Sequence, residues 1–179
     1  MKKRLLIVVI LGVFVCSLTG CGKTNLEEAQ EKYGSVEKET VDNLVAKFNT
    51  EVIDSGVLNP ASTDYLTEND NQYWYGLIEG IYLVVVPEKY TGDKTTEIVD
   101  YMLLYVYKSS KYEEDAYSYM QYLIKANNKN ITDTEINTLI EEAKTKSNSG
   151  KPANNGKGIS IGYTETDEVY QYQVLRLYK

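Results

Sequence analysis

The stretch QYWYGLIEGIYLVVVPE, residues 72–88, decides the fold of this chain. It is rich in aromatic and β-branched residues, and a turn signal at Glu79-Gly80 divides it in two. We therefore expect an antiparallel hairpin with strands over 72–78 and 81–87. Pro87 has no backbone N–H to donate, so it is expected to end the second strand.

A third strand is expected after this hairpin. The segment TTEIVDYMLLYVYKSS follows a turn at Thr91-Gly92-Asp93, and its composition predicts a strand over 96–108. A helix over the same residues stays open, because Met and Leu fit either state. A second hairpin is expected over 159–164 and 168–178. The loop before it, 147–158, is flexible by composition.

Three helices are expected from apolar residues at helical spacing. The first runs from Ser35, its expected N-cap, to Gly56, just past its end. The second covers 111–128, and the third starts with a capping box between Thr132 and Glu135. The apolar stripes of the three helices are Val41, Leu44, Val45, Phe48 and Val52; Tyr112, Ala116, Tyr119, Met120 and Leu123; and Ile136, Leu139, Ile140 and Ala143.

The order of these elements predicts an α+β fold: one helix, three strands, two helices and two strands. Hairpins in place of alternating βαβ units make the sheet mainly antiparallel, with about five strands and all helices on one face. The chain divides into a signal peptide over 1–20, a polar tether over 21–35 and a single domain over 36–179.

The start of the chain predicts export and lipid attachment. Met1 to Arg4 is cationic, and the apolar run from Leu5 to Val15 is shorter than the about 20 residues that a spanning helix needs. Leu18-Thr19-Gly20-Cys21 resembles the lipobox of bacterial lipoproteins. That resemblance implies cleavage between Gly20 and Cys21 and a diacylglyceryl group on the Cys21 thiol. Two acyl chains make a stable membrane anchor.

The alternative for this segment is an ordinary secretory signal with a chance cysteine. The resemblance covers only the first 21 residues, and no family is recognised for the domain behind them. A composition rich in Lys, Asn and Tyr favours a Gram-positive source. The expected location is therefore the extracytoplasmic face of the cell membrane.

Composition excludes several classes of function. The chain has 19 basic and 26 acidic residues, and loss of 1–20 removes three basic residues and no acid, so the net charge falls from −7 to −10. Such a domain repels phosphate, and nucleic-acid binding is not expected. The chain has no histidine, and its cysteines are Cys16 and Cys21, so neither a histidine-activated nucleophile nor a histidine zinc site is expected. No cofactor is predicted.

Two charged features remain open. Lys144, Lys146, Lys151 and Lys157 form a local basic segment that either contacts an anion or partner or is a solvated loop. Acidic clusters either hydrolyse a glycosidic bond of the cell wall or are solvated helix and turn surface. These clusters are Glu113-Glu114-Asp115, Glu141-Glu142 and Glu165 to Glu168.

Tyrosine is unusually frequent, with 17 residues against two Phe and one Trp. Tyrosine suits a half-buried sheet face and also a recognition surface. Alternation along a strand places Tyr73 and Tyr75 on one face and Trp74 on the other. We expect Trp74, the largest apolar group, in the core and the two tyrosines outside. The candidate binding surface is Tyr73, Tyr75, Tyr101, Tyr105 and Tyr107.

These observations predict a lipid-anchored envelope lipoprotein that acts as a non-enzymatic binding or accessory module outside the membrane. Its expected partners are the membrane, through the lipid on Cys21, and an envelope protein or a wall glycan. The alternative is a carboxylate-based hydrolase that acts on the cell wall.

Overall fold

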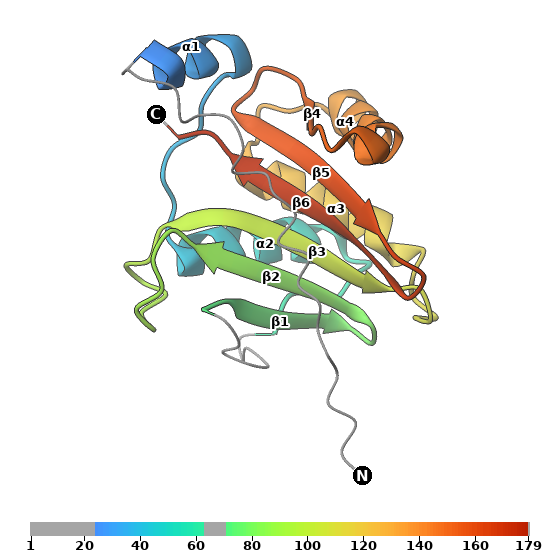
Figure 1. Cartoon of the computed structure of the whole chain (residues 1–179). Helices are drawn as coiled ribbons and strands as arrows, with labels where there is room; N and C mark the ends of the chain where they lie inside the picture. Colours follow the sequence, from blue (N-terminus) through green and yellow to red (C-terminus); the bar gives the residue numbers. More distant parts are fainter. Residues whose placement is uncertain (1–23, 63–70, 179) are drawn as a thin grey trace.

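The computed structural model describes residues 24–62 and 71–178, and it has the α+β class that the sequence predicts (Figure 1). Its helices are α1 (Thr24–Tyr33), α2 (Val41–Ser55), α3 (Asp115–Asn127), α4 (Asp133–Lys146) and the short 3-10 helix η1 (Ser147–Ser149). Its strands are β1 (Tyr73–Ile78), β2 (Ile81–Pro87), β3 (Val99–Tyr107), β4 (Ala153–Asn154), β5 (Ile159–Glu165) and β6 (Val169–Arg176). The lipobox lies outside the described residues.

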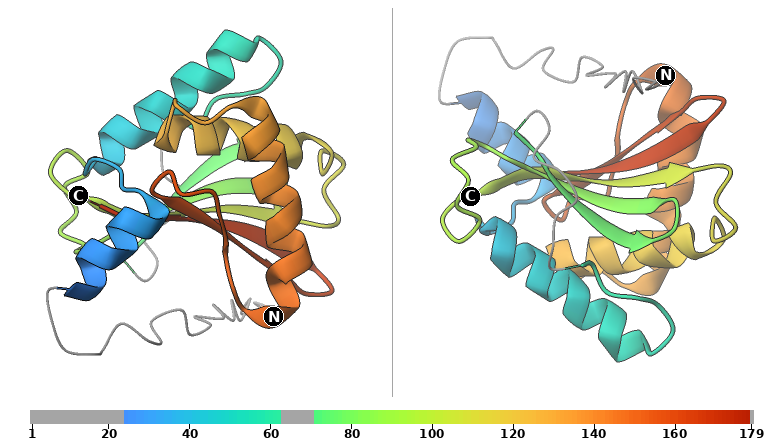
Figure 2. Two further views of the ribbon diagram at one scale, coloured as in Figure 1. Left: turned by 90° about the horizontal axis from the view of Figure 1, so that it is seen from above. Right: turned by 90° about the horizontal axis from the view of Figure 1, so that it is seen from below.

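The six strands form one antiparallel sheet in the order β1-β2-β3-β6-β5-β4. Helices α2 and α3 lie behind this sheet in Figure 1, and both views of Figure 2 show them on one side of it. Helix α4 packs on β5 and β4. In this order the C-terminal hairpin, β5 and β6, is joined to the rest of the sheet through the pairing of β6 with β3. The first hairpin contributes β1, which is one edge of the sheet, and β4 is the other edge.

The hairpin predicted from residues 72–88 is confirmed. Tyr75 lies opposite Leu83, and the chain turns at Glu79-Gly80. Gly80 has φ 82°, and an added Cβ there would lie 2.7 Å from Cβ of Ser110, so both the backbone conformation and the packing require glycine. Residues 99–107 form β3, so the helix alternative for this segment is wrong.

The structure differs from the predicted sheet in having a sixth strand. Ala153 and Asn154 pair with Ile161 and Ser160 of β5, inside the segment that we expected to be a flexible loop. The prediction of a flexible loop over 147–158 is therefore wrong at this pair and at η1. Two residues are too short a run for alternation to reveal a strand, and the pair is held by its pairing with β5 and its packing against α4.

Helix α2 begins later than predicted. Its N-cap is Thr40, whose hydroxyl accepts a hydrogen bond from the backbone N–H of Asn43, so Ser35 as N-cap is wrong. Thr40 itself is extended and makes a β-bridge with Ile98. Gly56 takes the left-handed conformation past the helix end, as predicted. The capping box of Thr132 and Glu135 at α4 is also confirmed.

The segment predicted as a polar tether contains helix α1, which the sequence analysis missed. Tyr33 accepts a hydrogen bond from Gly158 N–H at 2.6 Å, and Val36 bridges to Tyr178. A Cβ on Gly34 would lie 2.3 Å from the carbonyl oxygen of Gly156, so two glycine-containing backbones meet here. The end of the expected tether is therefore packed onto the domain.

The two faces of β1 are the reverse of our prediction. Tyr73 and Tyr75 are each 1% exposed and face the helices, whereas Trp74 is half-buried on the other side. Burial of Tyr73 is favourable because its hydroxyl donates a hydrogen bond of 2.5 Å to Glu97. The prediction placed Trp74 in the core because of its size alone. It did not consider that a tyrosine can be buried at little cost when its hydroxyl has a hydrogen-bond partner.

Candidate functional site

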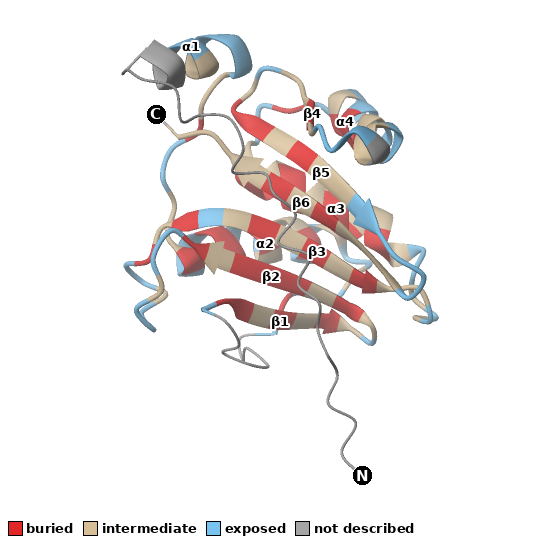
Figure 3. Cartoon of the chain, viewed as in Figure 1, coloured by how far each residue is buried: buried red, intermediate tan, exposed pale blue. Residues whose placement is uncertain are grey.

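One face of the sheet is turned away from α2 and α3. The strand residues whose side chains lie on this face, named below, are all uncharged. We name it the neutral face, and Figure 3 views it directly. Its aromatic half lies on β1, β2 and β3 and consists of Trp74, Gly76, Tyr82, Val84, Val86, Tyr101, Leu103, Tyr105 and Tyr107. Its polar half lies on β6 and β5 and consists of Val169, Gln171, Gln173, Leu175, Ser160, Gly162 and Thr164.

Four rings form a connected cluster in the aromatic half. The indole of Trp74 lies 5.5 Å from the ring of Tyr105 and 6.2 Å from that of Tyr82. Tyr107 extends the cluster, at 5.4 Å from Tyr105 and 6.2 Å from Tyr82. The rings meet edge to face, the arrangement that aromatic quadrupoles favour. The four rings therefore form one continuous aromatic surface and not a set of independent side chains.

Side chains of the aromatic half already lack much solvent contact. Trp74, Tyr82 and Tyr105 are half-buried, and Val84, which lies between Trp74 and Leu103 in the register, has no exposure. The indole Nε1 of Trp74 has no solvent contact and no hydrogen-bond acceptor among the described residues. An unpaired buried donor costs about 1–3 kcal/mol, so an acceptor from a partner would stabilise this face.

The charges near the neutral face lie at its rim. Burial, together with Tyr107 and Glu168, raises the pKa of Tyr105 to about 12. Burial and the nearby carboxylate of Asp100 also raise the pKa of Tyr101. Both hydroxyls are therefore neutral at physiological pH. An uncharged centre within a charged rim is the usual anatomy of a protein interface.

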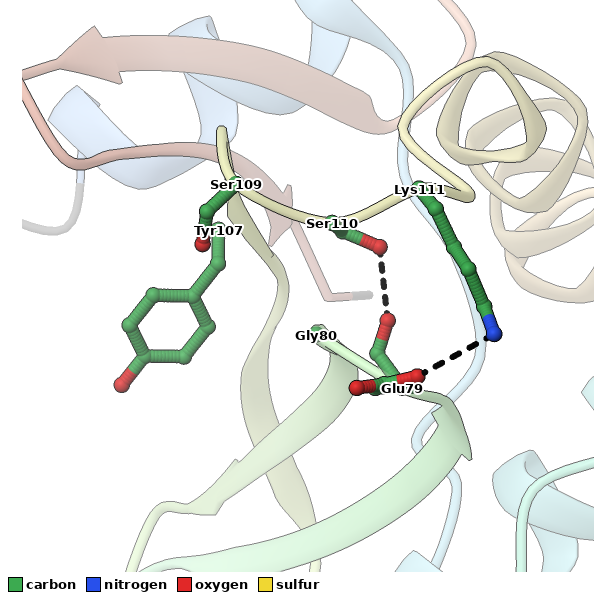
Figure 4. Close-up of a pocket in the computed structure, with 6 residues that line it drawn as sticks. All are labelled: Glu79, Gly80, Tyr107, Ser109, Ser110 and Lys111. Carbon is green, nitrogen blue, oxygen red and sulfur yellow. Dashed lines mark hydrogen bonds and ion pairs between the residues drawn. The ribbon is translucent and has the colours of Figure 1, made fainter.

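A shallow hollow of about 300 Å³ lies at one end of the aromatic half (Figure 4). Tyr107 forms one wall, and the other walls come from the turn at Glu79-Gly80 and the loop of Ser109 to Lys111. Ser110 donates a 2.6 Å hydrogen bond to the Glu79 carbonyl, and the Lys111 ammonium lies 3.5 Å from the Glu79 carboxylate. These two interactions join the turn to the loop. The hollow is therefore the space between two connected loops, beside the aromatic cluster.

One buried carboxylate was missed by the sequence analysis. Glu97 is 4% exposed and accepts hydrogen bonds from the hydroxyls of Tyr73 and Thr91 and the N–H groups of Thr91 and Gly92. Burial raises the pKa of this carboxyl, but the hydrogen bonds outweigh it and leave the pKa lowered. In an extended segment, side chains two residues apart point to the same side, so the apolar Val99 could have indicated that Glu97 points inward. Its role is structural, because its partners hold the loop before β3.

The charged candidates are engaged in local contacts. Lys144 and Lys146 pair with Glu141 and Glu142 on their own helix, so the basic segment is partly neutralised. Lys157 donates to Glu135, which lowers the pKa of that carboxyl to about 2. No group of three potential metal-ligating side chains occurs within residues 24–62 and 71–178. Nothing in these contacts favours the hydrolase alternative.

The structure brings together part of the predicted binding surface. Tyr101, Tyr105 and Tyr107 lie on the neutral face, whereas the outward placement of Tyr73 and Tyr75 is wrong. The sequence analysis missed Trp74 and Tyr82 as members, although alternation from Tyr105 through the strand register identifies both once the core face is known. Cys21 and Gly20 lie outside the described residues, and the lipid site stays a prediction.

Comparison with known proteins gives no relative for this chain. No protein-family model, curated protein or solved structure matches it. In the part of the chain that the structure describes, none of the helices combines the length and the apolar character needed to cross a membrane.

Proposed function

We propose that the chain is a lipid-anchored lipoprotein on the outer side of the cell membrane, and that it acts without catalysis by docking a protein surface on its neutral face. The observation that carries the docking proposal is the absence of charge from that face in a chain whose residues are 25% charged. Surface left to solvent normally gains charged residues, whereas interface centres lose them and gain aromatics.

The anchor part of the proposal is supported by the order of sequence signals at the N-terminus. A cationic start, a short apolar run and the lipobox at Leu18 to Cys21 follow one another. Only Gly22 and Lys23 separate Cys21 from α1, which begins at Thr24. Three residues span at most about 11 Å, so a lipid on Cys21 would hold the domain close to the bilayer.

Fractionation of cells tests the anchor. The wild-type chain should sediment with membranes and incorporate labelled palmitate, and Cys21→Ala should do neither. Equal labelling of both chains would show that the lipid is not on Cys21 and would overturn this part of the proposal.

Site-specific photo-cross-linking tests the docking face in the same cells. A photoreactive phenylalanine analogue replaces Tyr105 on the neutral face or, as control, Ile53, a 60% exposed residue on the outer side of α2. Protein adducts are expected from position 105 and not from position 53. Equal adduct yields at the two positions would mean that the neutral face has no special affinity.

A further inference from the structure

The neutral face has a row of residues that runs across the strands through its middle. Trp74 pairs with Val84, Val84 with Leu103, and Leu103 with Gln173. Gln173 pairs in turn with Gly162. This central row crosses five strands at right angles to them, with the aromatic half at one end and the polar half at the other.

We propose that the neutral face binds the neutral face of a second copy of this chain in the same membrane, with a two-fold axis along the central row. Such an axis places the aromatic half of one copy on the aromatic half of the other, and the polar half on the polar half. Two antiparallel sheets then stack about 10 Å apart, as in a β-sandwich.

Charge favours a second copy over a different protein. Every residue on a two-fold axis meets its own copy, so a charged residue there would face a like charge. The central row has none, while the rest of the chain is acidic and two copies repel each other elsewhere. An acidic domain that recognises a different protein gains from complementary charges across the interface, and this face offers none at its centre.

The place of α1 gives the second argument. Helix α1 lies at the end of β6, where Gln30 donates a hydrogen bond to the carbonyl oxygen of Tyr178, and it leaves the neutral face free (Figure 1). It is at the far side of the sheet from β1. The proposed dimer requires the membrane to lie on the side of the sheet opposite β1, so that the neutral face looks sideways along it. Two anchored copies can meet through it with their anchors on the same side.

Gly162 supplies a third argument at the polar end of the row. An added Cβ there would meet Gln173 at 3.7 Å, which is an ordinary contact, and Gly162 does not have a positive φ. The fold itself does not demand glycine at this position. A glycine within a strand often marks a place where another backbone comes close.

The size of the face indicates a dimer that depends on the membrane. Five strands about 4.8 Å apart, each with about seven residues rising about 3.3 Å, make a face of about 550 Å² in projection. A standard stable interface buries about 800 Å² per partner. Anchoring in one membrane raises the effective concentration of the two copies. The proposal rests on the lipid anchor for this reason.

Cross-linking of the full-length chain in membranes tests the proposal. The exported domain has no cysteine besides Cys21, so Gln173→Cys introduces one reporter thiol in the central row. A short bis-maleimide should join two copies and give a band of twice the chain mass. Val57→Cys, 82% exposed just after α2, is the control for random collisions and should give little of this band.

Charge at the row then tests the two-fold geometry. Leu103→Glu, added to the Gln173→Cys chain, should remove most of the cross-link, whereas Ile53→Glu should keep it. Co-expression of Leu103→Glu and Leu103→Lys chains should restore a mixed dimer, which also shows that both variants fold.

Three outcomes would overturn the proposal: a yield at Gln173→Cys no higher than at Val57→Cys, an adduct with a protein of different mass, or no recovery on mixing opposite charges. If the chain is labelled with palmitate but is cross-linked to a protein of different mass, the dimer proposal fails, while the proposed lipid anchor and docking face remain supported. If the chain is not labelled with palmitate, the proposed lipid anchor fails.

Discussion

The two faces of the sheet each carry a cluster of aromatic rings, and they treat the polar atoms of those rings differently. On the helix side, the ring of Tyr73 lies 5.4 Å from that of Tyr90, and its buried hydroxyl donates a 2.5 Å hydrogen bond to Glu97. On the neutral face, Trp74 and Tyr105 lie 5.5 Å apart, and no strand position offers a carboxylate.

This difference shows how one residue type serves two purposes. A carboxylate partner lets tyrosine pack under the helices, since the buried hydroxyl is satisfied. On the neutral face the hydroxyls of Tyr105 and Tyr107 hydrogen-bond each other instead, and the Trp74 indole Nε1 has no acceptor among the described residues. The fold therefore uses tyrosine as core material on one face and as contact surface on the other.

Adjacent leucines on β3 provide the most direct comparison. Leu104 has no exposure and faces the helices, whereas Leu103 is half-buried on the neutral face. Leu104→Ala should lower the free energy of unfolding by about 3 kcal/mol, because it leaves a cavity, and Leu103→Ala by about 1 kcal/mol. Urea denaturation of both variants measures the two losses. Equal losses would mean that the neutral face is packed as tightly as the core.

The hydroxyl of Tyr73 tests the polar support of the helix side. Tyr73→Phe removes one hydrogen bond to the buried Glu97 carboxylate and should cost about 1–2 kcal/mol. Tyr105→Phe on the neutral face is the matched control and should cost less. Urea melts at pH 7 distinguish the two, and a larger loss from Tyr105→Phe would contradict the contrast between the faces.

The same pair predicts a pH dependence. Because the folded pKa of Glu97 is lowered, its contribution to stability is present above the ordinary pKa of about 4.3 and is lost as the pH falls through the folded value. Tyr73→Phe should reduce this contribution, so its melting temperature should decline less steeply than that of the wild type between about pH 5 and pH 3. A steeper decline in the variant would reverse the assigned sign.

The capping box of α4 should have a smaller effect that is confined to the helix side. Thr132→Ala removes the hydroxyl that accepts from Glu135 N–H and should cost about 1 kcal/mol. Fluorescence of Trp74, the only tryptophan, should stay unchanged below the melting transition because the indole lies on the opposite face. A shifted emission maximum in the folded variant would show that the faces are coupled.

The smallest effect is expected on the polar half of the neutral face. Gln173→Ala should change the free energy of unfolding by less than about 0.5 kcal/mol, because its side chain is only half-buried and lies on the face turned away from the helices. Thermal denaturation of the monomeric protein at low concentration measures the change. A loss above about 1 kcal/mol would make Gln173 part of the fold and not of the contact surface.

Local signals explain which predictions succeeded. The turn at Glu79-Gly80, the capping box at Thr132 and the C-terminal glycine at Gly56 each depend on residues close in sequence, so composition and spacing revealed them. Helix α1 was missed because its polar residues lack an apolar stripe, and its contact with residues 156–158 joins distant parts of the chain.

The sequence by itself determined the α+β class, the hairpins and the expectation of a lipid anchor, because alternation, turn residues and the lipobox are local patterns. Only the tertiary structure decided which face of each strand meets the helices. Alternation separates Trp74 from Tyr73 and Tyr75, but it is symmetric between the two sides of a sheet. The partner that breaks this symmetry is Glu97, which lies 24 residues from Tyr73 and comes within hydrogen-bond distance only when the chain has folded.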